Sequence, residues 1–319
     1  MLKYARGEYV SSRTICETFQ TSRTAIWKHV QSLQKQGYSV EAVPSKGYRL
    51  LEMDDFVSAY EIKDYIQAKV FGKLIAYRES VDSTNSAARQ LADQGEPEGT
   101  LVIADEQTHG RGRFQRKWYS PAKSGIWMSL ILRPNLSIVE APRLTVLTAV
   151  AVAKTLTKLS NQQAYIKWPN DILFDGKKVC GILTEINVEG NQINYVIVGI
   201  GINVNLRQDE LPISLQPSVC SLQSFVHQPL KRARVVANIL STLEDLYITC
   251  LKSGDFTGVM NYFKIHNVTL GHVVEIQSGS SRLAGIVEDI DDYGALVIRT
   301  TDHQIKKIYS GDILSSSVQ

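Results

Sequence analysis

The segment Gly110-Arg111-Gly112-Arg113, followed by Arg116, Lys117 and Trp118, constrains the fold most strongly. Glycines alternate with arginines and no hydrophobic period runs through the segment, which favours a loop. Glycine lets the backbone approach a ligand closely, and guanidinium groups bind carboxylates and phosphates through paired hydrogen bonds. Because its like charges repel, we expect the loop to become ordered around an anion. A solvated, disordered basic loop is the alternative.

The composition is that of a globular protein with room for two or three domains. The chain has 319 residues, of which 44% are hydrophobic and 21% charged. No apolar run approaches the ~18 residues of a membrane-spanning helix, so we expect no membrane association. The cysteines Cys16, Cys180, Cys220 and Cys250 form no Cys-x-x-Cys pair. This spacing argues against a zinc site or a disulfide framework and favours a reducing, cytoplasmic setting.

Charge is unevenly distributed along the chain. Residues 1–51 hold eight Lys or Arg and three Glu, a net charge of +5, whereas the whole chain has +3. A basic module therefore precedes a slightly acidic body. This asymmetry indicates a polyanion as the partner of the first fifty residues.

Residues 12–36 are predicted to form two short helices around a turn. Thr21 or Ser22 can cap the second helix, and Gly37 is its expected end. Spacings of four and three place its apolar side chains on one face. These core positions are Ile26, Val30 and Leu33. The opposite side and the following hairpin supply the side chains expected to contact DNA, which are Ser22, Arg23, Thr24, Trp27, Lys28 and Lys46.

Two extended runs, 38–43 and 47–51, follow these helices and are joined through Pro44-Ser45-Lys46. A helix-turn-helix followed by a basic hairpin is a winged helix, which binds DNA. A small helical interaction module with merely solvated charges is the alternative. Only about six residues are left for the helix that usually opens such a module, so we expect it to be shortened.

From residue 75 to about 205, strands predominate and do not alternate regularly with helices. This pattern predicts an α+β fold with a mixed or largely antiparallel sheet and helices on one face. The predicted strands are 74–77, 100–106, 125–132, 164–168, 179–186 and 195–203. The predicted helices are 60–70, 83–94, 140–159 and 232–251.

The last fifty residues have short strands at 273–276, 283–289, 296–300 and 304–309, separated by turn-forming residues. This spacing predicts a small SH3-like β-barrel, either a stabilising lid or a substrate-docking module. We therefore expect three domains. They are a winged helix-turn-helix at 1–52, a catalytic domain at 60–268 and the barrel at 269–319.

Three strings in order resemble those of biotin–protein ligases. They are Asp82-Ser83-Thr84-Asn85, the run 107–113, and Lys167-Trp168-Pro169-Asn170-Asp171, which is followed by Lys178-x-x-Gly181-Ile182. With its N-terminal module, the chain from about residue 10 onward resembles the bifunctional bacterial biotin ligases and biotin-operon repressors. The resemblance implies an enzyme that makes biotinoyl-5′-AMP from biotin and ATP with Mg²⁺. It then transfers biotin to a lysine of biotin carboxyl carrier protein.

The resemblance also implies roles for individual residues. Those implied for biotin are Ser83, Thr84, Asn85, Gln107, Arg111, Gly112, Arg113 and Lys178. Those implied for ATP and the adenylate are Gly110, Arg111, Arg113, Trp118, Asn170 and Asn203. Lys178 and Arg113 are the implied catalytic residues. Asp171 is a candidate Mg²⁺ ligand or holder of the acceptor lysine, and a turn aspartate is the alternative.

The chemistry of the substrates fits these residue types. Short neutral side chains satisfy the uncharged ureido ring of biotin without desolvating an ion, although Ser83 is also placed to cap the next helix. Cations are needed to bring two anions, the biotin carboxylate and the α-phosphate, into line. The alternation Gly199-Ile200-Gly201-Ile202 is expected to leave room for a ligand on its glycine face. Family members often have a tryptophan near Val219 for adenine stacking, and this chain lacks it.

The resembling proteins also repress genes of biotin synthesis or uptake. Adenylate binding orders their loops and promotes homodimerisation through an edge strand, which allows binding to palindromic operator DNA. Tyr195–Val198 is the expected edge strand here. Two alternatives are a lipoate or octanoate ligase of the same architecture and a biotin-sensing transcription factor without ligase activity.

Overall fold

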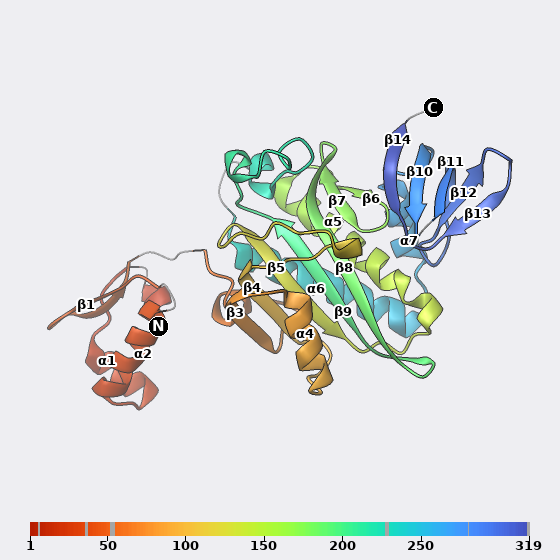
Figure 1. Ribbon diagram of the computed structural model, residues 1–319. Coiled ribbons are helices and arrows are strands. Elements are labelled where there is room, and N and C mark those ends of the chain that lie inside the picture. Colours follow the sequence, from red (N-terminus) through yellow and green to blue (C-terminus); the bar gives the residue numbers. More distant parts are fainter. Residues whose placement is uncertain (6, 36–37, 52–54, 227–229, 280, 318–319) are drawn as a thin grey trace. The chain divides into compact units, whose positions relative to one another are not determined.

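The computed structural model describes residues 1–5, 7–35, 38–51, 55–226, 230–279 and 281–317. The chain divides into two compact units, Met1–Phe56 and Val57–Gln319, whose elements are labelled in Figure 1. Among the described residues, no helix combines the length and apolarity needed to cross a membrane.

The N-terminal unit is a helix-turn-helix followed by a hairpin. After a 3₁₀ turn, η1 (Leu2–Ala5), come α1 (Ser12–Phe19), α2 (Arg23–Lys35) and the antiparallel strands β1 (Val40–Val43) and β2 (Gly47–Leu50). Ser22 begins α2, because its Oγ accepts a hydrogen bond from the Ala25 amide at 3.2 Å. The small core consists of Ile15, Ile26, Val30 and Val40, with Leu2 and Leu33 packed against it. Gly37 and the joint at 52–54 lie outside the described residues.

The second unit is built on a seven-stranded mixed sheet, as predicted. Its order is β3-β4-β5-β9-β8-β7-β6, with β3 and β4 parallel and the other neighbours antiparallel. The strands are β3 (Ile75–Val81), β4 (Leu101–Gln107), β5 (Gly125–Leu132), β6 (Tyr165–Lys167), β7 (Asp171–Phe174), β8 (Lys177–Glu189) and β9 (Gln192–Asn203). The short strand β7 was not predicted.

Helices lie on both faces of this sheet. The long helices α5 (Pro142–Ser160) and α6 (Arg232–Ser253), with α7 (Thr257–Ile265), share the main hydrophobic core on one face. The prediction that all helices lie on one face is wrong for the helix expected at 83–94, because its own apolar side chains pack against the opposite face of the sheet. Helix α4 (Thr84–Asp93) packs on the other face through a separate cluster that includes Ala88 and Ile197. Figure 1 shows α4 in front of the sheet and α6 behind it. The sheet therefore keeps part of the α4 face open for a site.

The helix predicted over 60–70 is wrong beyond its first turn. Helix α3 spans only Ala59–Lys63. The backbone amides of Lys69, Val70 and Phe71 donate instead to the carboxylate of Glu244, at 2.6, 2.7 and 2.6 Å. A charged acceptor on α6 thus takes the amides that a longer α3 would bond internally.

The expectation that Tyr195–Val198 is an edge strand is also wrong. These residues lie in β9, which pairs with β5 on one side and with β8 on the other. All four are buried. The edges of the sheet in the described part of the chain are β3 and β6, so this segment has no free backbone edge for a second subunit.

The C-terminal residues form a five-stranded antiparallel sheet in the order β13-β12-β11-β10-β14. Its strands are β10 (Val273–Ser278), β11 (Ser281–Ile290), β12 (Leu296–Thr300), β13 (Ile305–Ile308) and β14 (Asp312–Ser317). Strand β14 was not predicted. Trp168 Nε1 donates to Gly294 O at 2.8 Å and Trp168 is buried, so this tryptophan joins the C-terminal sheet to the catalytic body.

Candidate active site

A cavity of about 470 Å³ lies beside the N-terminal end of α4. Its walls come from α4, the loop after β4, strands β7, β8 and β9, and Asp312 of β14. Of the predicted ligand-binding residues, Gly110 does not line it. Those that do are Ser83, Thr84, Asn85, Gln107, Arg111, Gly112, Arg113, Trp118, Asn170, Asp171, Lys178 and Asn203. Residues from separate motifs thus surround one space.

One end of the cavity is polar and uncharged. Gln107 Oε1 accepts hydrogen bonds from Thr84 N at 2.9 Å and Thr84 Oγ1 at 3.1 Å, while Gln107 Nε2 donates to Ser120 Oγ at 3.0 Å. Ser83 precedes α4 in an extended conformation, and its side chain makes no capping hydrogen bond. The capping alternative for Ser83 therefore does not hold, and its hydroxyl lies on the cavity wall.

The other end is cationic. Among the described lining residues are six cations, namely Arg111, Arg113, Arg116, Lys117, Lys167 and Lys178, but two carboxylates, Asp171 and Asp312. Lys178 Nζ pairs with Asp171 Oδ1 at 2.7 Å and lies 5.0 Å from the Trp118 ring centroid. The adjacent residue Lys177 does not line the cavity. An excess of fixed positive charge of this kind attracts anionic ligands.

Arg113 is held by the start of the C-terminal sheet's last strand. Its guanidinium donates to Gly311 O and Ser310 Oγ, both at 3.0 Å, and lies 3.9 Å from Asp312 Oδ1. Arg116 pairs with the same Asp312 carboxylate. Burial lowers the pKa of Arg113, and the Asp312 carboxylate opposes that shift. These contacts of Arg113 could not be predicted from the sequence, because no local pattern links residues about two hundred positions apart.

The glycine face of β9 is not empty. A Cβ on Gly199 would overlap the amide of Asn85, and one on Gly201 would lie 2.6 Å from Trp118 Nε1. Asn85 and Trp118 therefore depend on the absence of a side chain at both positions, and both glycines also line the cavity. The indole N–H of Trp118 is buried and has no hydrogen-bond acceptor among the described residues. A buried, unpaired donor of this kind is rare and indicates that a bound acceptor belongs beside it.

Asn170 and Asn203 anchor backbone on the cavity wall. Asn170 Nδ2 donates to Ile182 O at 2.6 Å, and Asn203 Nδ2 donates to Cys220 O at 3.0 Å. Both side chains are buried. The backbone of Lys178 pairs with that of Val219, which lines the cavity.

In the N-terminal unit, α2 has the two faces expected of a recognition helix. Ile26 and Val30 are buried, whereas the predicted DNA-contacting residues are exposed. These are Ser22, Arg23, Thr24, Trp27, Lys28 and, on the hairpin, Lys46. Trp27 keeps 54% of its surface accessible, although the small core lies next to it. The side chains predicted to contact DNA are thus accessible on one face of α2 and on the hairpin.

Family models match three parts of the chain. The biotin/lipoate A/B protein ligase family matches residues 77–203, an HTH domain matches 1–49, and the biotin protein ligase C terminal domain matches 269–314.

Whole-length relatives agree with these matches. The bifunctional ligase/repressor BirA of Bacillus subtilis (strain 168) is 40% identical over 313 residues, 98% of this chain and 96% of that protein. The protein of the same name from Escherichia coli (strain K12) is 30% identical over 317 residues, 99% of this chain and 95% of that one. Among solved structures, biotin protein ligase from Aquifex aeolicus in complex with biotin and ATP has a TM-score of 0.65 and 28% identity. It covers 77% of this chain and 100% of its own.

Proposed function

The chain belongs to the bifunctional ligase/repressors of the biotin/lipoate A/B protein ligase family, and we propose that its cavity joins biotin to ATP as biotinoyl-5′-AMP. The biotin is then passed to a lysine of biotin carboxyl carrier protein. One observation carries the proposal: the same cavity is lined by uncharged polar side chains, among them Thr84 and Gln107, and by an excess of cations, among them Arg113 and Lys178. Biotin has the same division, with a neutral ureido ring at one end and a carboxylate at the other.

In the first step, a biotin carboxylate oxygen attacks the α-phosphorus of ATP, and pyrophosphate leaves. Both reactants are anions, so the fixed cations must lower their repulsion and hold them in line. Lys178 projects from strand β8, and a side chain on a paired strand loses little entropy when it meets its ligand. We assign Lys178 to the carboxylate and α-phosphate oxygens and Arg111 and Arg113 to the phosphate.

In the second step, the neutral amine of the acceptor lysine attacks the carbonyl carbon of the mixed anhydride, and AMP leaves with the bonding electrons. The anhydride is hydrolysable, so the site must exclude water. The loop that carries Gly110 and Gly112 is in place to cover it. Gly110 packs against Ser120 and the Trp118 backbone, where a Cβ would not fit. We assign Trp118, Asn170 and Asn203 to the adenylate, with the indole N–H of Trp118 as a donor to it.

We propose that Mg²⁺ binds together with the nucleotide. No cluster of three or more His, Cys, Asp or Glu that could hold a metal occurs among the described residues. Mg²⁺ suits such a site, because it keeps several waters and binds one or two carboxylates together with substrate phosphates. Asp171 is the proposed protein ligand, because it pairs with Lys178, which we assign to the α-phosphate.

We further propose that the three modules have the boundaries 1–52, 60–268 and 269–319, and that the first binds operator DNA through α2 and the hairpin. We also propose that the protein forms a homodimer when the adenylate is bound, through a surface other than the strand segment Tyr195–Val198. The four free thiols support a cytoplasmic setting.

The decisive experiment combines the protein with biotin, ATP, Mg²⁺ and a biotin carboxyl carrier domain. We expect pyrophosphate release and a mass increase of one biotinoyl group on the acceptor lysine. Replacing biotin by lipoate is the matched control, and preferential use of lipoate would instead favour a lipoate ligase. Operator binding without any pyrophosphate release would favour a biotin sensor that lacks ligase activity.

A further inference from the structure

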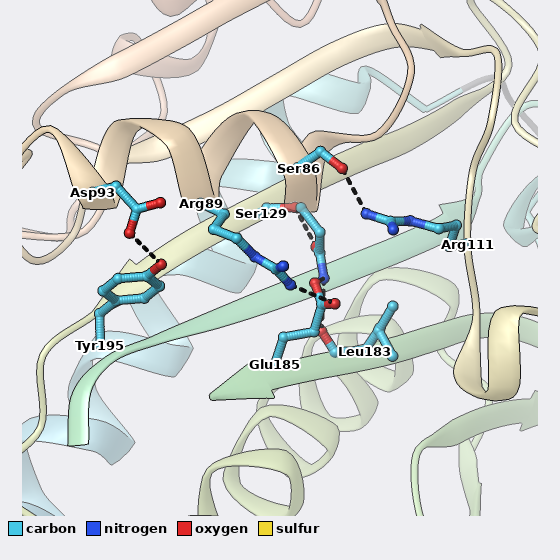
Figure 2. A network of polar contacts seen from close by, with 9 residues as sticks. Ser86, Arg89, Asp93, Arg111, Ser129, Leu183, Glu185 and Tyr195 are labelled. Atoms are coloured by element: carbon cyan, nitrogen blue, oxygen red, sulfur yellow. Dashed lines mark hydrogen bonds and ion pairs between the residues drawn. The ribbon is translucent and has the colours of Figure 1, made fainter. Parts of the chain in front are cut away.

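Beside the uncharged end of the cavity, polar side chains form a continuous chain that begins at the protein surface. Arg89 Nη2 donates to Glu185 Oε1 at 2.9 Å, and Asn85 Nδ2 donates to Glu185 Oε2 at 2.7 Å. Figure 2 shows Arg89 on α4 directed at Glu185 on β8. The Arg89 side chain is 49% exposed and the Glu185 side chain 27%, whereas Asn85 is only 4% exposed. The chain therefore connects a solvated ion pair to a buried amide.

Glu185 determines which way the Asn85 amide faces. An ionised carboxylate only accepts hydrogen bonds, so the atom of Asn85 that faces it must be the nitrogen. The same nitrogen donates to Leu183 O at 3.3 Å, which uses both of its hydrogens. Asn85 Oδ1 is left facing Ser129 Oγ, 2.6 Å away. With the opposite amide orientation, Asn85 Oδ1 would face two groups that only accept, the Glu185 carboxylate and Leu183 O.

The orientation of the Asn85 amide also affects the hydrogen bonds of Thr84, because Ser129 lies between the two side chains. Ser129 has one hydroxyl hydrogen, and Asn85 Oδ1 takes it at the shorter distance. Ser129 Oγ is also within donor distance of Thr84 Oγ1, at 2.8 Å, but its single hydrogen cannot serve Thr84 while it is bound by Asn85 Oδ1. The hydroxyl hydrogen of Thr84 is then directed at Ser129, or at Gln107 Oε1 at 3.1 Å. In both cases a lone pair of Thr84 remains for the cavity, which Thr84 lines.

We propose that Glu185 is a positioning residue: by holding the Asn85 amide it keeps the Ser129 hydrogen on Asn85 Oδ1 and off Thr84 Oγ1, which leaves Thr84 Oγ1 free to accept from a ring N–H of the substrate, such as that of a cyclic urea. The proposal rests on the proposed function of the cavity. A purely stabilising role explains the arrangement less well, since an exposed ion pair such as Arg89–Glu185 adds little to stability. The orientation of the Asn85 amide depends on the hydrogen bond that the Glu185 carboxylate accepts from it, and much less on Arg89.

The informative variant is Glu185→Gln, because it keeps the shape but gives position 185 a donor as well as an acceptor. The Asn85 amide can then turn over, and the Ser129 hydrogen can turn towards Thr84 Oγ1. Thr84 Oγ1 would then be less available as an acceptor for the ligand. We expect the Kd for biotin, measured by calorimetry on the full chain, to rise about tenfold, as for the loss of one well-placed hydrogen bond. Glu185→Asp retains an acceptor-only group and is expected to recover most of the affinity. Glu189→Gln, at the exposed end of the same strand, is the matched control and should bind as wild type.

A second ligand separates positioning from structural damage. Biotin methylated on a ureido nitrogen lacks one ring N–H, so wild-type protein should bind it much more weakly than biotin. In Glu185→Gln this discrimination should shrink by about tenfold, whereas a loosened fold would weaken both ligands equally. Ser129→Ala interrupts the same chain from its other side and should give the same pattern.

Three results would contradict these proposals. Unchanged biotin affinity in Glu185→Gln, or an equal loss for biotin and its methylated analogue in both variants, overturns the positioning role while leaving the ligase proposal intact. If wild-type protein neither binds biotin nor releases pyrophosphate with biotin and ATP, the proposed function fails, and the role of Glu185 fails with it.

Discussion

The ammonium of Lys178 lies 2.7 Å from the carboxylate of Asp171, across the neighbouring strands β8 and β7. Both side chains line the cavity. The pair holds the lysine side chain in place before any anionic ligand arrives. A substrate carboxylate or phosphate can then exchange with Asp171 as the partner of an already positioned cation.

Replacing Lys178 by alanine is therefore expected to abolish adenylate formation. Loss of a preorganised charge at the reacting oxygens should slow pyrophosphate release by roughly a hundredfold or more, about 3 kcal/mol in the barrier. Lys177→Ala is the matched control, since its side chain does not line the cavity. Stopped-flow or coupled detection of pyrophosphate measures both, and equal loss in the two variants contradicts the assignment.

The Asp171→Asn variant tests the proposed metal ligand. If Asp171 supplies an oxygen to nucleotide-bound Mg²⁺, the amide should shift the Mg²⁺ dependence of pyrophosphate release to higher concentration, because carboxylates bind Mg²⁺ more strongly than amides. A Mg²⁺ titration at fixed ATP measures the shift. A lower maximal rate with an unmoved titration midpoint would leave Asp171 as a partner of Lys178 alone.

Arg113→Ala should weaken retention of the adenylate. Arg113 reaches from the loop to Gly311 O and Ser310 Oγ, so its loss removes both a phosphate donor and the loop's tie to the C-terminal sheet. We expect release of biotinoyl-5′-AMP to quicken by about ten- to a hundredfold, as for one or two charge-assisted hydrogen bonds. Chase experiments with preformed adenylate measure the rate. A wild-type release rate would remove Arg113 from the site.

Much of the site could be predicted because its residues fall in short strings. The strings around Ser83, Gln107 and Lys178 converge on one cavity, since each sits where a strand meets a loop or a helix. The partners that support them could not be predicted. Asp312 and Glu185 carry no local signal, and their contacts with Arg116 and Asn85 exist only after distant segments pack together.

The errors in the fold have the same origin. A continuous apolar run such as Tyr195–Val198 predicts a strand but does not say whether one or two neighbouring strands pair with it, and β9 has two. The pattern after Tyr60 fits a helix until Glu244, on a distant helix, binds the amides of Lys69, Val70 and Phe71. The local sequence preference determines the secondary structure of a segment only where no stronger tertiary contact competes with it.

The glycines of β9 provide a test of packing within the site. In Gly201→Ala the new methyl group would meet the Trp118 indole at 2.6 Å, so the indole must move out of its place in the cavity. Overpacking of this kind costs roughly 1–3 kcal/mol, and we expect adenylate affinity to fall while the fold survives. Thermal unfolding and ligand binding are measured together. Gly190→Ala, at the β8–β9 turn with open space around it, is a control for substitution as such, although its positive φ of 60° adds some strain.

The DNA-binding proposal predicts a specific electrostatic response at Lys28. This residue is exposed on α2 beside Trp27, where an ammonium can contact a phosphate but cannot read sequence alone. Lys28→Ala should weaken binding to operator and unrelated DNA by similar factors and reduce the slope of log K against log salt by about one. Pyrophosphate release should stay at the wild-type rate, because the cavity lies in the other unit. Lys63→Ala, an exposed cation of that second unit, controls for net charge. If Lys28→Ala leaves both affinity and salt slope unchanged, α2 is not the surface that faces the phosphates.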